Sequence, residues 1–184
     1  PRDREDLRHI LEAANATGTS LFPRGAGTGF SGGSLAVDGG VVIDFLGMNK
    51  VLELDEEDML VRVQPGVNTW HLQKLVEAKN LYFPPDPASL KICTLGGNVA
   101  ENAGGPHCLK YGVTRDYVMV LDGFTGDGRE FSAGKATHKN RAGYDLRHLL
   151  IGSEGTLAVF SSMTLKLIPK PEGRILFLAF FRDL

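Results

Sequence analysis

Two glycine-rich segments carry the residues of this sequence that could bind a ligand. The first, residues 23–34, reads PRGAGTGFSGGS and has glycines at positions 25, 27, 29, 32 and 33. Glycine lets the backbone curl around an anion, because no Cβ shields its N–H groups. Arg24 would add a positive charge, and hydroxyl donors would come from Thr28, Ser31 and Ser34. A tight connection between strands needs about one or two glycines, so this segment favours anion binding over a simple turn.

The same glycines must be compared with two common nucleotide fingerprints. Gly27, Gly29 and Gly32 fit GxGxxG, which in a Rossmann unit is followed by a helix. Here Ser34 is followed by LAVDGG and then by the β-forming run VVIDF, so the context argues against an NAD-type Rossmann site. No Gly-Lys-Ser/Thr follows the glycines, which argues against a Walker A loop.

The second segment, residues 95–105, reads LGGNVAENAGG, with helix-compatible residues between paired glycines. It predicts a short helix starting near Gly96, whose N–H groups and positive dipole end would point at a phosphate. Asn98 and Asn102 are four positions apart, so their amides would share a face and could bind a polar ligand edge. The alternative is close packing of the helix on a neighbour, which requires small residues on one face only.

The elements that must position these segments are mostly strands. Strands outnumber helices and rarely alternate with them, so an α+β fold is favoured over a doubly wound sheet. Residues 84–112 form a long, glycine-rich connection, which is typical of a functional loop. The expected elements are a helix over 7–14 ending at Gly18, strands at 20–22 and 41–45, a hairpin around 56–58, a helix capped by Asn68 or Thr69, strands flanking a 126–128 turn, one long strand or a strand pair at 157–168, and a strand-forming run at 175–184.

Composition excludes several classes of function. The net charge is −2 with both signs interspersed, which argues against nucleic-acid binding. Cys93 and Cys108 form no CxxC pair, so we expect reduced thiols and neither a disulfide framework nor a zinc site. No stretch approaches the roughly 18 apolar residues of a membrane span, and no signal peptide opens the chain. We therefore expect a soluble, cytoplasmic protein, with any membrane association made through partners, and both chain ends look like cuts through a longer polypeptide.

Five motifs give a specific resemblance. PRGAGTGFSGGS, PPDPAS, CTLGGNVAENAGG, HCLKYG and IGSEGTLAV follow one another in this order. The chain thereby resembles, over nearly its whole length, the PCMH-type (vanillyl-alcohol-oxidase-like) FAD-binding domain, and within it the FAD subunit of glycolate oxidase and the D-lactate and D-2-hydroxyglutarate dehydrogenases. The resemblance implies a single α+β FAD-binding domain with lobes at about 1–46 and 47–184. It implies that the substrate domain, with its metal site and base, lies beyond residue 184.

The resemblance also implies the residues that surround FAD. Around the pyrophosphate it places Arg24, Gly25, Gly27, Thr28, Gly29, Gly32, Gly33 and Ser34. Along the flavin and diphosphate it places Pro85, Asp86, Thr94, Gly96, Gly97, Asn98, Asn102, Gly104 and Gly105, and near the adenosine half Glu154, Gly155 and Val159. No histidine occurs between Pro23 and Ser34, so non-covalent FAD is expected. Ala158 stands where many relatives have glycine.

The expected function is oxidation of small D-2-hydroxy acids, with hydride transfer to FAD and electrons passed to an unidentified acceptor or partner subunit. Residues 1–184 supply no convincing base and no metal site, so this chain alone should bind FAD without turnover. Two alternatives stay open: a non-catalytic dinucleotide-binding module, and a flavoenzyme of the same fold acting on another alcohol. For His107, a structural role is favoured over a position at the flavin edge.

Overall fold

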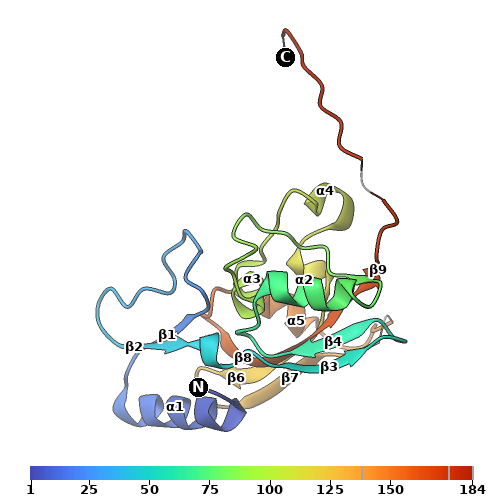
Figure 1. The fold of residues 1–184 in the computed structure, drawn as a ribbon. Helices are drawn as coiled ribbons and strands as arrows, with labels where there is room; N and C mark the ends of the chain where they lie inside the picture. Colours follow the sequence, from blue (N-terminus) through green and yellow to red (C-terminus); the bar gives the residue numbers. More distant parts are fainter. Residues whose placement is uncertain (138, 174, 184) are drawn as a thin grey trace.

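The fold is built on one antiparallel sheet, seen in a computed structural model that describes residues 1–137, 139–173 and 175–183 (Figure 1). The sheet has five strands in the order β3-β4-β8-β6-β7. Every neighbouring pair is antiparallel. Its strands are β3 (Val51–Asp55), β4 (Leu60–Val63), β6 (Val118–Thr125), β7 (Glu130–Gly134) and β8 (Ala158–Lys166).

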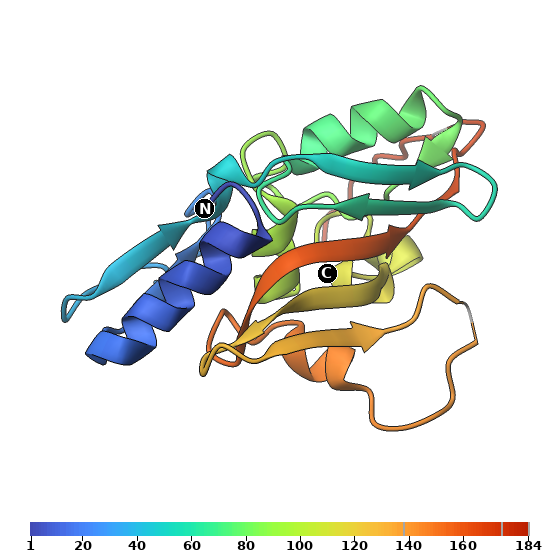
Figure 2. The ribbon, with the colours of Figure 1, turned by 90° about the horizontal axis from the view of Figure 1, so that it is seen from below.

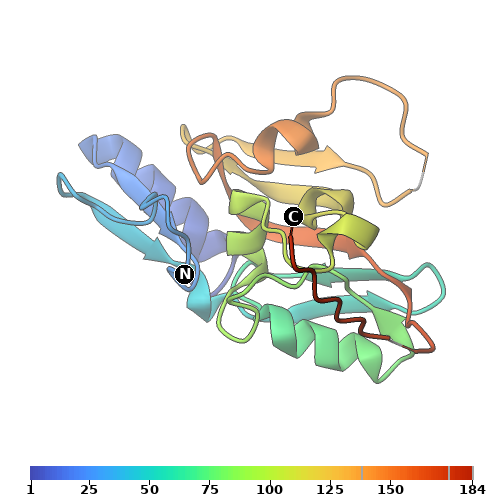
Figure 3. The same cartoon turned by 90° about the horizontal axis from the view of Figure 1, so that it is seen from above.

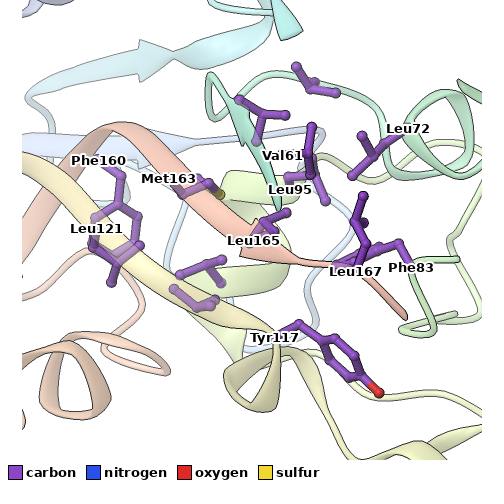
Figure 4. Packing of buried hydrophobic residues seen from close by; sticks show 14 of the residues in the cluster. Val61, Leu72, Phe83, Leu95, Tyr117, Leu121, Phe160, Met163, Leu165 and Leu167 are labelled. Atoms are coloured by element: carbon purple, nitrogen blue, oxygen red, sulfur yellow. The ribbon is translucent and has the colours of Figure 1, made fainter. Parts of the chain in front are cut away.

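Helices α2 (Thr69–Glu77) and α3 (Leu95–Glu101) lie over one face of this sheet (Figures 1 and 3). The side chain of Asn68 accepts a hydrogen bond from the His71 N–H and so caps α2, as expected. The main core lies between these helices and the sheet (Figure 4) and contains Val61, Leu72, Phe83, Leu95, Leu121, Met163 and Leu165, all at most 1% exposed. Burying these apolar side chains is the main force that holds α3 in place.

The opposite face of the sheet carries polar side chains, because residues alternate between the faces of a strand. Arg62 Nη2 lies 3.0 Å from Asp122 Oδ2 and 3.2 Å from Ser162 Oγ. Ser162 Oγ in turn lies 2.9 Å from Asp122 Oδ2, so the network joins three strands. This part of the second face is therefore hydrogen-bonded, whereas the face under α2 and α3 is apolar.

A smaller unit stands beside the sheet and is built from α1 (Arg4–Thr17), β1 (Leu21–Arg24) and β2 (Val41–Asp44) (Figure 2). The two strands pair in parallel. Helix α1 starts at the N-cap Asp3 and ends at Gly18, whose φ of 67° is left-handed. Its Leu7 and Leu11 pack with Ile43 and with Phe124 and Val159 of the large sheet, which fixes β1 against the start of β8.

Short elements complete the chain. They are η1 (Phe45–Gly47), β5 (Leu81–Tyr82), α4 (Cys108–Tyr111), η2 (Thr114–Asp116), α5 (Leu146–Leu150) and β9 (Ile168–Pro169), with β5 and β9 forming an antiparallel pair. Within the described residues, no helix is long and apolar enough to cross a membrane.

The expected α+β fold and its antiparallel sheet are confirmed. The alternatives for residues 157–168 resolve into one long strand, β8, followed by the short β9. The Ala158 substitution leaves the backbone regular, since Ala158 pairs with Thr125 as the first residue of β8. The strand-forming run 175–184 forms no strand over its described residues 175–183, which are exposed; Arg174 and Leu184 lie outside the described part. A strand forms only where its backbone hydrogen-bonds to a neighbouring strand, and none of the described strands pairs with this run.

Candidate functional site

A cleft with a volume of about 280 Å³ lies between the small unit and the large sheet. It is lined by the loop 23–34, the start of α3 and the segment 154–160. These three stretches are far apart in sequence and meet because α1 and β2 pack on Phe124 and Val159. The volume is close to the lower end, roughly 300 Å³, of ligand-binding clefts.

The two glycine segments converge at this cleft, as their composition predicts. A Cβ on Gly25 would lie 2.3 Å from Thr94 Oγ1 and 3.6 Å from both the N and the Cα of Gly97. Such an approach is open only to glycine, because a real side chain would overlap the threonine. The loop after β1 and the first turn of α3 therefore form adjoining walls.

The loop 25–34 has the backbone shape of an anion-binding turn. Gly27 and Gly32 have φ values of 67° and 80°, in the left-handed region that favours glycine. The guanidinium of Arg24 lies over Gly27, where an added Cβ would meet its Nε at 3.0 Å. A Cβ on Gly32 would meet only a Leu35 methyl at 3.9 Å, so little shields this backbone. The segment thus offers bare N–H groups beside one cation.

The expectation that the first N–H groups of α3 are free to bind a phosphate is wrong, because oxygens of the protein already accept hydrogen bonds from most of them. The N–H of Leu95 donates to Val67 O at 2.9 Å and that of Gly96 donates to Pro65 O at 2.8 Å. Thr94 Oγ1 accepts from Gly97 N at 3.3 Å, a long bond. Only the Gly97 N–H is weakly held, so α3 offers its dipole and one N–H rather than a full set of free donors.

Gly96 and Gly97 have different surroundings. A Cβ on Gly96 would lie 2.6 Å from Pro65 Cβ and 2.9 Å from Pro65 O, so this glycine permits close packing of α3 on the strand exit. At Gly97 a Cβ would meet only Thr94 Oγ1 at 3.3 Å. The packing interpretation therefore applies to Gly96, while Gly97 leaves the cleft wall open.

Two carboxylates lie beside the second half of the loop 25–34. A Cβ on Gly29 would be 2.7 Å from Glu101 Oε1, and one on Gly33 would be 3.4 Å from Glu154 Oε2. Partial burial, with the nearby negative charge of Glu154, raises the pKa of Glu101, while a hydrogen bond from Ser31 Oγ, 3.5 Å from its Oε1, opposes the shift. These acceptors suit hydroxyl groups and disfavour phosphate at this end.

The segment 152–160 is fixed against the other walls by its backbone. The N–H of Glu154 donates to Ala100 O at 2.9 Å, which ties the segment to α3. Gly155 has a φ of 77°, and a Cβ there would lie 2.9 Å from Pro23 Cγ. Val159, 8% exposed, gives this wall an apolar surface.

The structure brings most of the expected residues to the cleft and leaves some outside it. Asn98 lines the cleft, but its amide nitrogen donates to Thr69 Oγ1 at 2.8 Å. Asn102 instead ends α3 with a φ of 50° and accepts from Arg115 N at 2.9 Å, so the two amides present no common ligand face. Lining the cleft are Arg24, Gly25, Gly27, Thr28, Gly29, Gly32, Gly33, Ser34, Thr94, Gly96, Gly97, Asn98, Glu154, Gly155 and Val159; outside it lie Pro85, Asp86, Asn102, Gly104 and Gly105.

Asp86 belongs to a separate polar cluster beside the cleft. Its Oδ2 lies 2.9 Å from His107 Nδ1, and its Oδ1 accepts from the His107 N–H at 3.1 Å. A Cβ on Gly105 would overlap the Asp86 carbonyl, so this glycine packs against the same loop. The cluster joins the loop 83–89 to the residues after α3, which agrees with the structural role favoured for His107.

Four further residues that were not expected from the sequence also line the cleft: Glu101, Phe45, Pro65 and Cys93. Glu101 follows Asn98 by three positions, so it lies on nearly the same helical face as a residue that was selected. The other three come from the strand exits and loops around the cleft, and no local pattern marks them.

Comparison with known proteins gives one family and several relatives. The FAD binding domain family matches residues 1–134. Glycolate oxidase subunit GlcD of Bacillus subtilis is 44% identical over 184 residues, covering 100% of this chain and 39% of that protein. D-lactate dehydrogenase of Anaerostipes hadrus is 41% identical, covering 93% of this chain and 36% of that protein. D-2-hydroxyglutarate dehydrogenase of Stutzerimonas stutzeri is 42% identical, with coverages of 93% and 37%.

Among solved structures, alkyldihydroxyacetonephosphate synthase superposes with a TM-score of 0.81 at 27% identity, covering 94% of this chain and 34% of that one. The chain therefore spans less than two fifths of the length of this structure and of the three relatives above.

Proposed function

The chain belongs to the family of FAD-binding domains, and from this premise we propose that it holds the FAD of an oxidoreductase acting on small D-2-hydroxy acids. The substrate class is supported by relatives named glycolate oxidase subunit, D-lactate dehydrogenase and D-2-hydroxyglutarate dehydrogenase, each more than 40% identical. The observation that carries the cofactor assignment is the convergence of two glycine segments on one cleft.

The cleft residues fit a dinucleotide that has a diphosphate in its middle and a ribose beside the diphosphate. Gly97 leaves space that a Cβ would fill, and the guanidinium of Arg24 lies over the backbone of Gly27 in the facing loop. These features suit a diphosphate, because N–H groups and a guanidinium stabilise its oxygens. Glu101 and Glu154 lie at the other end, where carboxylates accept hydrogen bonds from ribose hydroxyls.

Bound FAD supplies the two-electron acceptor for hydride transfer. In the proposed mechanism the residues of this chain bind FAD and orient it. The loop 25–34 and Gly97 hold the diphosphate, and Glu101 accepts from a sugar hydroxyl. Val159, Phe160 and Pro65 give the cleft apolar walls that exclude water from the bound cofactor.

A second candidate is a flavoenzyme of the same fold acting on a different substrate. The superposition on alkyldihydroxyacetonephosphate synthase favours it, because that protein shares the fold and is not named for a hydroxy acid. The hydroxy-acid assignment is preferred, since the relatives named for hydroxy acids have higher sequence identity.

The proposal includes three further expectations: FAD is held without a covalent bond, the protein works in the cytoplasm, and electrons pass to a partner. The name "glycolate oxidase subunit" supports a partner chain for the relative that bears it. Denaturation followed by filtration tests the first expectation, because a non-covalent flavin then leaves the polypeptide. Flavin retained on the denatured chain would contradict it.

The experiment that tests the function has two steps. First, FAD is titrated into residues 1–184 and followed by flavin fluorescence, with FMN as the comparison because FMN lacks the diphosphate and the adenosine. Second, the longest natural polypeptide carrying this domain is loaded with FAD and mixed anaerobically with glycolate, D-lactate, D-2-hydroxyglutarate and their L-enantiomers where these exist. Bleaching of the flavin by glycolate or by the D-acids, and not by the L-enantiomers, is expected.

The two steps separate the alternatives. Binding of FAD without bleaching by any hydroxy acid would favour the other-substrate flavoenzyme or a non-catalytic module. Equal affinity for FMN and FAD would contradict the cleft assignment itself.

A further inference from the structure

A second cavity, with a volume of about 250 Å³, lies at the other end of the large sheet. Strand β8 begins with Ala158 at the glycine cleft and ends with Lys166 at this second cavity. Its other walls come from η2, the start of β6, the residues after β7 and α5, and α5 contacts both β6 and β7. The two cavities share no lining residue. We call the second one the basic cavity, defined by Arg115, Asp116, Met119, Lys135, Thr137, Asn140, Arg147, His148 and Lys166.

The charges around the basic cavity do not balance. Its lining has four permanently cationic side chains and one carboxylate, Asp116. Asp116 Oδ2 already accepts from the Val113 N–H at 2.8 Å. Among the described residues, no ion pair joins Arg115, Lys135 or Lys166 to a carboxylate. In a chain whose net charge is −2, this is a local concentration of positive charge.

Arg147 is held in place by the protein yet keeps one donor without an acceptor. Its Nη1 donates to Val118 O at 2.7 Å and its Nη2 to Asp145 Oδ2 at 3.1 Å. Its Nε is buried and has no hydrogen-bond partner. A buried donor on a charged group costs free energy until an acceptor reaches it.

Two neighbouring residues are also held by the fold, Arg115 through its backbone and Lys166 through its ammonium group. The backbone N–H of Arg115 donates to Asn102 Oδ1 at 2.9 Å, which fixes η2 against the end of α3. Lys166 Nζ lies 5.3 Å from the centre of the Tyr117 ring, a cation–π distance.

We propose that the basic cavity binds a small anion with at least two negatively charged oxygens, of the phosphate or dicarboxylate class. Such a ligand places one oxygen within reach of a rigid guanidinium and others near the lysines, which a single carboxylate cannot do. The size of the cavity suits a small molecule rather than a nucleic-acid strand or a protein surface. The proposal does not depend on the function proposed for the glycine cleft.

Calorimetric titration of the FAD-saturated chain tests the proposal, because FAD then blocks the glycine cleft to the probes. The probes are inorganic phosphate, succinate and acetate at low ionic strength. Phosphate and succinate are expected to bind with millimolar or tighter affinity, and acetate at least about tenfold more weakly. Absence of phosphate and succinate binding, or equal affinity for acetate, would overturn the proposal.

A pair of double variants locates the site. Arg115→Gln with Lys166→Gln removes two charges from the basic cavity, and Lys50→Gln with Lys170→Gln removes two exposed charges elsewhere. The double variant in the basic cavity should bind phosphate about tenfold or more weakly than the unmodified chain. The control double variant should lose less than about threefold in phosphate affinity. Melting temperature and FAD affinity should stay unchanged in both. Equal phosphate affinities in the two folded variants would show that the ligand does not bind in this cavity.

Discussion

Substitution of Gly97 by alanine separates binding from stability. Alanine in a helix interior is favoured over glycine by about 0.8–1 kcal/mol. The new Cβ meets only Thr94 Oγ1, at 3.3 Å, so that hydroxyl must move by a few tenths of an ångström and its capping bond weakens. The two effects oppose each other, and we expect the unfolding free energy to change by less than about 1 kcal/mol.

Binding of FAD should respond very differently to the same methyl group. It would occupy the open wall of the cleft, beside the one N–H of the first turn of α3 that is weakly held. Displacing a diphosphate oxygen from that N–H should weaken FAD binding at least tenfold, which is about 1.4 kcal/mol. Urea denaturation of the ligand-free chain measures the stability, and a fluorescence titration measures the affinity.

Gly126→Ala is the matched control, because Gly126 has open space around its Cβ position and lies in the turn after β6, away from the cleft. It should leave the affinity for FAD unchanged. An unchanged affinity in folded Gly97→Ala would refute the assignment of Gly97 to the ligand wall.

Three further predictions concern Gly96, Glu101 and Tyr117. Gly96→Ala should lower stability by about 1–3 kcal/mol in denaturant titration, since its Cβ would overlap Pro65; unchanged stability would refute the packing role. The raised pKa of Glu101, caused by partial burial and by Glu154, means that the folded state favours its protonated form. Its contribution to stability is therefore present below the unfolded-state pKa of about 4.3 and is lost as pH rises through the folded value, so Glu101→Gln should flatten the decline of the melting temperature as pH rises above about 4.3. Burial raises the pKa of Tyr117 to about 12, so its stabilisation is present below the unfolded-state pKa of about 10 and is lost as pH rises through 12; in an ultraviolet titration, ionisation of Tyr117 near pH 10 in the folded chain would contradict this.

Local patterns were enough to place most of the elements. The strand-forming runs on either side of the turns at 56–58 and 126–128 predicted the β3–β4 and β6–β7 hairpins, and Asn68 and Gly18, both expected at helix ends, are caps in the structure. These features depend on residues a few positions apart. The run after residue 173 was misread because strand formation needs a partner edge, which a local pattern does not contain.

The cleft was predictable where glycines mark it and not where packing decides it. The composition of the loop 25–34 indicated bare backbone, and the structure places that loop at the cleft. The use of α3's N–H groups by Pro65 and Val67 depends on how the exit of β4 passes under the helix, which sequence spacing does not encode. The basic cavity combines residues from η2, β6, the segment after β7, α5 and β8, so only the folded chain brings its charges together.

The central claim is that the loop after β1 and the first turn of α3 contact the same FAD molecule. Backbone amide NMR of residues 1–184 during an FAD titration tests it most directly. We predict that the amides of the loop 25–34 and of Gly97 shift together, with one common dissociation constant. Shifts confined to one of these segments, or two different dissociation constants, would contradict the claim.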